Sequence, residues 1–148
     1  MQPTQAAIAL VKASEGLHLT AYQDATGVYT IGFGHTDGVH PGMRIIEQQA
    51  EEFLAADLAM TGRAVSALVR VPLAQCQFDA LTDFVFNLGQ ERLRKSTLLR
   101  LLNAGQLQAA AAQFKFWVLA DGKPEPGLIK RRAAEAALFL VRPAGRTC

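Results

Sequence analysis

The spacing of apolar and polar residues predicts a mostly helical chain interrupted by one short β segment. A first helix is expected from Thr4, its N-cap, to Gly16, where it stops. Within it, Ile8, Val11 and Glu15 fall on one stripe at helical spacing. Glu15 therefore lies in the last turn of the helix, on or beside the apolar face and close to the negative end of the helix dipole.

A change of period marks the β segment. The residues from Asp24 to Gly27 are typical of a turn, and residues 28–33, rich in β-branched and aromatic side chains, predict a strand. Strand alternation places Thr30, Gly32 and Gly34 on one face. Because glycines carry no side chain, we expect a floor beside the Thr30 hydroxyl that leaves room for a ligand, with Gly32 among the substrate-binding residues.

The rest of the chain is expected to be nearly all helical. The predicted helices cover residues 47–69, 74–88, 97–104, 107–118 and 127–140, with a turn-rich loop at residues 120–126. This pattern predicts an α+β fold in which a β lobe, at about residues 17–45, is segregated from a larger helical lobe within one domain covering residues 1–148. A cleft between the two lobes is the expected place for a site.

Length and composition favour one soluble globular domain. The 148 residues are enough for one core, and 50% hydrophobic with 19% charged residues is unlike a disordered chain. The net charge of +2 indicates no nucleic-acid partner. The two cysteines, Cys76 and Cys148, lack the spacing of a disulfide framework or a CxxC site, and the sequence leaves their redox state open.

No segment predicts membrane insertion or export. The longest stretch without Asp, Glu, Lys or Arg, residues 101–114, is too short and too polar to cross a bilayer. Residues 1–16 lack the basic region and the cleavage site of a secretory signal. We therefore expect the protein to be made in the cytoplasm and to stay there until the membrane is opened.

Three polar residues converge on the β segment. Eight residues separate Glu15 from Asp24, and five separate Asp24 from Thr30. Taken one by one, a solvated glutamate, an aspartate of an Asx turn and an ordinary strand threonine are the more common explanations. Together, two carboxyl groups in different environments and a hydroxyl that can hold water provide what glycoside hydrolysis requires. A sugar polymer is therefore the expected substrate class.

The segment EGLHLTAYQDATGVYTIGFGH, residues 15–35, resembles the phage-type lysozymes, which are endolysin muramidases. Their motif is Glu, eight residues, Asp or Cys, five residues and Thr, and here it matches Glu15, Asp24 and Thr30. The resemblance continues through FDALTDFVFNLG, STLLRLLNAG, FKFWVLADGK and GLIKRR, and so covers nearly the whole chain in order. It implies a lysozyme-like fold with no metal or organic cofactor.

The resemblance also implies a reaction. The substrate would be peptidoglycan, cut at the β-1,4 bond between N-acetylmuramic acid and N-acetylglucosamine, with Glu15 as general acid, Asp24 as partner carboxylate and Thr30 positioning water. Related enzymes mostly invert the anomeric centre, which implies carboxyl groups about 6.5 to 9.5 Å apart; the residues alone leave the stereochemistry open. The protein would act as a monomer and reach the wall from the host cytoplasm after a separate holin permeabilises the inner membrane.

Other residues are expected to support this site. Asp57 falls on the apolar stripe of its helix, where a carboxylate needs a partner, and similar lysozymes pair it with the position of His35. We expect Arg131, and after it Arg132, to approach Glu15 or the glycan, although three cations in a row are also typical of a solvated helix face.

Asn87 is expected to hydrogen-bond an acetamido group of the substrate. The histidines His18, His35 and His40 show no metal-ligand spacing, so no metal site is predicted. Three alternatives remain: a lytic transglycosylase that uses Glu15 alone, a glycan-binding module without turnover, and a helical protein that regulates or binds nucleic acid.

Overall fold

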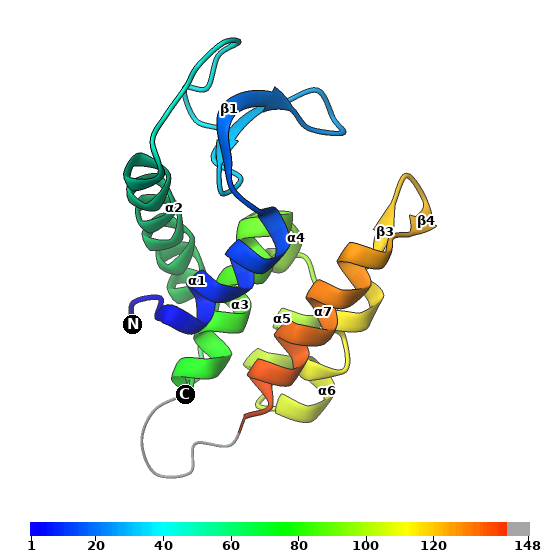
Figure 1. The fold of residues 1–148 in the computed structure, drawn as a ribbon. Coiled ribbons are helices and arrows are strands. Elements are labelled where there is room, and N and C mark those ends of the chain that lie inside the picture. The colour runs from blue at the N-terminus through cyan, green and yellow to red at the C-terminus, as the bar shows by residue number, and fades with distance from the viewer. Residues whose placement is uncertain (142–148) are drawn as a thin grey trace.

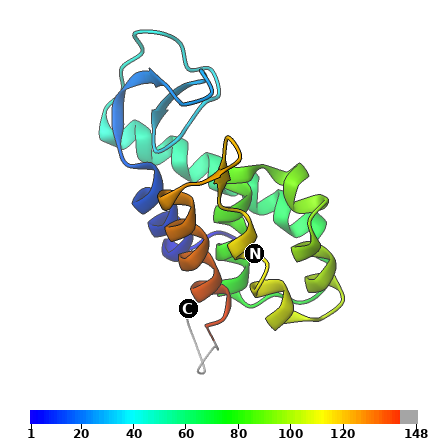
Figure 2. The same ribbon diagram turned by 90° about the vertical axis from the view of Figure 1, so that its right-hand side faces the viewer.

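The structure is a computed structural model that describes residues 1–141. It has a β lobe and a helical lobe, and the long helix α2 (Glu47–Leu68) runs from one to the other (Figures 1 and 2). Helices combine with two-stranded sheets, so the predicted α+β class is confirmed.

Helix α1 (Gln5–Glu15) begins and ends where the sequence predicts. The hydroxyl of Thr4 accepts a hydrogen bond from the backbone N–H of Ala6, and Gly16 ends the helix with φ of 68°. Ala7 and Val11 are fully buried. This buried stripe fixes the rotation of the helix and places Glu15, its last residue, next to the β lobe.

The β lobe is built on one antiparallel hairpin. Strand β1 (His18–Gln23) pairs with β2 (Tyr29–Gly32) in a register that sets Tyr22 opposite Thr30. Further pairing through Thr20 and Arg44 holds the following loop against the hairpin. A hydrophobic cluster joins this lobe to α1 and to the first half of α2; its buried members are Val11, Ile31, Phe33, Ile45, Ala50, Leu54 and Leu58.

The helical lobe surrounds helix α3 (Gln75–Leu88), which packs against α1, α2 and α7 (Pro126–Phe139). The remaining helices are α4 (Gln90–Arg94), α5 (Thr97–Asn103), α6 (Leu107–Ala111) and the 3₁₀ turn η1 (Phe114–Phe116). A second hydrophobic cluster fills this lobe. Helix α3 also carries Asp79 and Asp83 into this interior, so acidic as well as apolar side chains are buried in the helical lobe.

Two predicted elements need correction. The single helix expected over residues 107–118 is divided into α6 and η1, because the tighter turn buries Phe114 edge-on against Phe84 and Phe139, with ring centres 5.7 and 5.6 Å away. The loop expected at residues 120–126 contains a small hairpin, β3 (Leu119–Ala120) with β4 (Lys123–Pro124). Its turn is formed by Asp121 and Gly122, both with positive φ.

The structure also bears on membrane insertion and on the two cysteines. Within residues 1–141, no helix is long and apolar enough to cross a bilayer. Cys76 is buried on α3. Cys148 lies outside the described residues.

Candidate active site

Glu15 lies where α1 meets the β lobe. Its side chain is 23% exposed, and its Oε1 atom accepts a hydrogen bond from Nη1 of Arg131 at 2.7 Å. The backbone of Gly34 lies directly on the carboxyl group, because a Cβ atom there would stand 3.0 Å from the Glu15 Cδ atom. The arginine and the glycine thus hold this carboxyl group from two sides.

Arg131 links Glu15 to a buried carboxylate. Its Nε and Nη2 atoms donate to the two oxygens of Asp83 at 2.9 and 2.8 Å. Burial alone would lower the pKa of Arg131, but hydrogen bonds and charge from Asp83 and Glu15 raise it above its usual range. The guanidinium of Arg131 is therefore always charged. Because Asp83 pairs with it through two hydrogen bonds, the Asp83 carboxylate neutralises much of the positive charge that faces Glu15.

Asp24 lies at the start of the hairpin turn. Its Oδ1 atom accepts hydrogen bonds from the hydroxyl and N–H of Thr26 and from the N–H of Val28, at 2.8, 2.8 and 2.9 Å. The Thr26 hydroxyl is the largest cause that lowers the pKa of Asp24. Asp24 is therefore an Asx-turn residue, as one sequence interpretation holds, and it is also a firmly ionised carboxylate.

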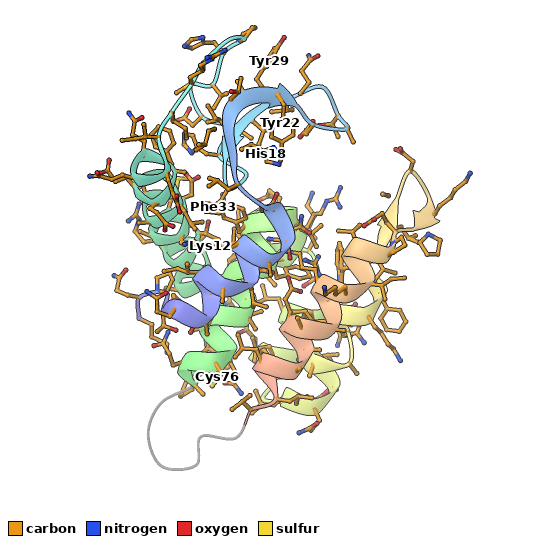
Figure 3. All side chains as sticks on the ribbon, in the orientation of Figure 1. Lys12, His18, Tyr22, Tyr29, Phe33 and Cys76 are labelled. Atoms are coloured by element: carbon orange, nitrogen blue, oxygen red, sulfur yellow. The ribbon has the colours of Figure 1, made fainter. Side chains whose placement is uncertain are left out.

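Thr30 is almost fully buried in β2 and donates its hydroxyl hydrogen to the carbonyl of Val28 at 3.0 Å. Its register partner is Tyr22, whose hydroxyl has a raised pKa because of partial burial and, after that, the nearby charges of Glu15 and Asp24. In Figure 3, Tyr22 and His18 lie on the side of the hairpin that faces the helical lobe, whereas Tyr29 lies on the opposite side.

Two hollows lie in this region, one lined by Glu15 and the other by its neighbour Gly34. One, of about 360 Å³, lies between the loop after β2 and the helices α2 and α3; Gly34, Asp57 and Phe86 contribute to its walls. The other, of about 400 Å³, lies between α1 and α7 and is lined by Glu15, Asn87 and Arg131 among others. Glu15 lines the second hollow, and Gly34, which packs against its carboxyl group, lines the first.

Gly32 does not form the open floor expected from strand alternation. It is buried with φ of 63°, and a Cβ atom there would meet the Cβ of Ala50 at 3.3 Å. The glycine is explained by the close approach of β2 to α2. The bare surface next to the carboxyl group belongs to Gly34 instead.

Arg132 and Asn87 contact each other. The Nη2 atom of Arg132 donates to the Asn87 carbonyl at 3.0 Å and to Glu135 at 2.7 Å. Its hydrogen bonds within the described residues do not include Glu15, so of the two arginines only Arg131 makes the expected approach. Both arginines are buried, which excludes the solvated helix face as their explanation.

His35 and Asp57 are brought together as the sequence suggests. The Nδ1 atom of His35 lies 2.7 Å from Oδ2 of Asp57, and the imidazole stacks on Phe53 with ring centres 4.3 Å apart. Backbone hydrogen bonds between His35 and Ile31 fix the loop that carries the histidine. This contact ties the β lobe to the middle of α2.

Sequence reasoning missed Asp83 and Tyr22. Asp83 interrupts the apolar stripe of α3 and is fully buried; a charge on an apolar stripe is the same sequence signal that indicates a partner for Asp57. Tyr22 offers no comparable signal, because a tyrosine in a strand is common. Within residues 1–141, no group of three or more His, Cys, Asp or Glu side chains gathers as metal ligands do.

Comparison with known proteins identifies the family. The phage lysozyme family model matches residues 12–135. The endolysin of Salmonella phage P22 is 46% identical over 145 residues, covering 95% of this chain and 99% of that protein. The endolysin of Acyrthosiphon pisum secondary endosymbiont phage 1 is 44% identical over 143 residues, covering 94% of this chain and 98% of that protein.

Comparison with solved structures supports the same family. The muramidase domain of SpmX from Asticaccaulis excentricus superposes with a TM-score of 0.88 at 38% identity, covering 95% of this chain and 99% of that one. A single-site variant of P22 lysozyme gives 0.83 at 43% identity, with the same two coverages. The chain belongs to the phage lysozyme family and is a glycoside hydrolase.

Proposed function

We propose that this enzyme hydrolyses the β-1,4 bond between N-acetylmuramic acid and N-acetylglucosamine in bacterial peptidoglycan and so lyses its host. The observation that carries the proposal is the environment of Glu15: a partly exposed carboxyl group that lines a hollow, is hydrogen-bonded by Arg131 and packs against Gly34. The names of the relatives, endolysin and muramidase, support the same substrate.

Glu15 is the general acid. It protonates the glycosidic oxygen as the bond to the anomeric carbon breaks, and the charge that develops is that of an oxocarbenium ion. Arg131 would hinder this role if its full charge stabilised the Glu15 carboxylate. Because Asp83 takes two of its hydrogen bonds, Arg131 acts mainly to orient the carboxyl group.

Asp24 and Thr30 hold the water that attacks the anomeric carbon. Three hydrogen bonds to Asp24, from Thr26 and Val28, converge on Oδ1, so Oδ2 is the oxygen proposed to accept from the water. The hydroxyl hydrogen of Thr30 is given to Val28, so its oxygen acts as an acceptor. A water that donates to both residues turns its lone pair toward the sugar. The separation of about 6.5 to 9.5 Å between the carboxyl groups stays a prediction.

Asn87 donates a hydrogen bond to an acetamido group of the bound glycan. We further propose that the enzyme is a cytoplasmic monomer that reaches the wall only when a separate holin opens the inner membrane. Expression in the cytoplasm of a Gram-negative bacterium, with and without an inducible holin, tests this route. Lysis is expected only when both proteins are present.

The central experiment is digestion of purified Gram-negative peptidoglycan by the wild type and by Glu15→Gln, followed by mass spectrometry of the released fragments. Reducing muramic acid ends are expected from the wild type. General acid catalysis is worth about 10² to 10⁴ in rate, so the variant should lose at least 10²-fold while keeping its circular dichroism spectrum.

Other products would identify another function. Anhydro-muramic ends from the wild type would make the protein a lytic transglycosylase. Binding of peptidoglycan without any release would make it a glycan-binding module. Equal turnover by Glu15→Gln would remove Glu15 from the role of general acid.

A further inference from the structure

Arg132 is a buried cation whose contacts differ from those of its neighbour Arg131. Its side chain is 1% exposed, and its guanidinium carbon lies 5.2 Å from the ring centre of Phe84. Its Nη2 atom donates to both Glu135 and Asn87, whereas Nε and Nη1 are buried without a hydrogen-bond partner within residues 1–141. Burying unpaired N–H groups is costly, so stability alone gives no reason for an arginine at this position.

The contact with Asn87 has a chemical consequence. A guanidinium has only donors, so the amide atom that faces Arg132 must be the carbonyl oxygen. The NH₂ group of Asn87 then lies on the side of the amide away from Arg132, so that both of its hydrogens are available to donate to another group. Without Arg132, a rotation of half a turn would exchange the two ends and present the oxygen instead.

Asn87 lines the same hollow as Glu15 and Arg131. We propose that Arg132, anchored by Glu135, is a positioning residue that fixes the amide of Asn87 so that its N–H donors face the carbonyl of an N-acetyl group on the glycan. This inference rests on the proposed function, because it assumes that a glycan fills the hollow. It makes the enzyme specific for N-acetylated sugar.

Arginine is required for this arrangement. Glu135 lies one helical turn after Arg132 on α7 and accepts from Nη2 at 2.7 Å, while Asn87 on α3 accepts from the same atom at 3.0 Å. The planar fork and the stacking on Phe84 hold Nη2 between the two acceptors. A lysine ammonium on a flexible stem lacks both the fork and the stacking, so it leaves the amide free to turn.

The test compares N-acetylated peptidoglycan with the same material after chemical de-N-acetylation. For Asn87→Ala and Arg132→Lys, we expect kcat/KM on the N-acetylated substrate to fall roughly tenfold, mainly through KM, the value of one lost hydrogen bond. The rate on the de-N-acetylated substrate should stay at the wild-type level. Arg94→Lys changes an exposed arginine paired with Glu91 and serves as the matched control, with no change expected on either substrate.

A double variant separates positioning from a general structural effect. If Arg132 acts through Asn87, Arg132→Lys should have no further effect on the N-acetyl preference in an Asn87→Ala background. The inference is overturned if Asn87→Ala keeps the wild-type preference, or if Arg132→Lys folds and keeps it. Should Arg132→Lys fail to fold, the result for Asn87→Ala still decides whether the amide reads the N-acetyl group. A wild type that cleaves neither substrate overturns the proposed function itself.

Discussion

At the scale of single residues, the contact between Gly34 and Glu15 constrains the position of the Glu15 carboxyl group. A side chain at position 34 would meet the Glu15 carboxyl group at 3.0 Å, and φ of 78° is a conformation that other residues adopt only with strain. We expect Gly34→Ala to lower the free energy of unfolding by roughly 1 to 3 kcal/mol and also to reduce kcat by displacing Glu15. Turnover of peptidoglycan and chemical denaturation measure the two effects.

Gly38 provides the matched control for this change. Its φ of 68° is similarly positive, but nothing lies within 4 Å of the Cβ atom that an alanine would add. Gly38→Ala should therefore lose stability to a similar degree and keep its turnover. If both variants lose kcat equally, the effect comes from backbone strain and not from the contact with Glu15.

Glu135 should make stability depend on pH in the opposite sense to most carboxyl groups. Burial, followed by its hydrogen bond with Asp83, raises the pKa of Glu135 from 4.5 to about 10. Between these values the folded state binds a proton that the unfolded state releases. The contribution is fully present below pH 4.5 and is lost as the pH rises toward 10.

Glu135→Gln removes this dependence because glutamine is close in shape to the protonated acid. We expect the wild type to lose unfolding free energy relative to Glu135→Gln as the pH rises, by up to about 1.4 kcal/mol per pH unit. Denaturation at several pH values between about 5 and 9 measures the difference. Glu91→Gln is the control: Glu91 is exposed and Arg94 lowers its pKa, so no difference should develop over that range. A flat difference for Glu135→Gln would show that Glu135 is ionised in the folded protein.

At the scale of elements, sequence signals for caps and stripes identified most helices. Thr4 caps α1 as expected, and Ser96 caps α5 in the same way, because an N-cap hydroxyl is a local signal. The predicted helix boundaries were wrong where tertiary packing, and not the local sequence, determines where a helix ends. The burial of Phe114 breaks the helix expected over residues 107–118, and no local pattern near residue 114 shows that a hydrophobic pocket lies opposite.

In the candidate site, too, the features that depend on local sequence were predicted and those that depend on tertiary packing were not. The motif formed by Glu15, Asp24 and Thr30 is visible in the sequence, and the sequence also predicted the approach of Arg131 to Glu15. The contacts of Arg132 could not be predicted, since they depend on the rotation of α7 against α3. Gly32 was assigned to the wrong surface because strand alternation does not reveal that α2 covers that side of the hairpin.

The link between His35 and Asp57 joins the β lobe to α2, and its loss should destabilise that junction. Asp57→Asn removes the charge that faces His35 but keeps the size of the side chain. We expect the free energy of unfolding to fall by roughly 1 to 3 kcal/mol, the cost of weakening a half-buried hydrogen bond to a charged group. Urea denaturation measures the loss, with the exposed Asp37→Asn as control. An unchanged midpoint for Asp57→Asn would remove the structural role.

At the scale of the whole molecule, two separate hydrophobic clusters stabilise the enzyme. One joins the β hairpin to α1 and the first half of α2, and the other fills the helical lobe around α3. Helix α2 contributes Leu54 and Leu58 to the first cluster and Val65 to the second. Because the two lobes have their own hydrophobic clusters, we expect the β lobe to open while the helical lobe stays folded.

Hydrogen exchange of two matched core variants tests this separate opening. Leu54→Ala in the β-lobe cluster and Leu98→Ala in the helical cluster should each cost about 2 to 5 kcal/mol. If the β lobe opens alone, the opening still keeps the helical cluster intact, so Leu98→Ala should leave the protection of the Ile31 amide unchanged and lower that of α3 amides. Leu54→Ala should lower both, because the β-lobe cluster is lost in local and in global unfolding alike. Equal loss at both places in Leu98→Ala would mean that the two lobes unfold as one cooperative unit, and the cleft would then have to admit a glycan strand without independent motion of the β lobe.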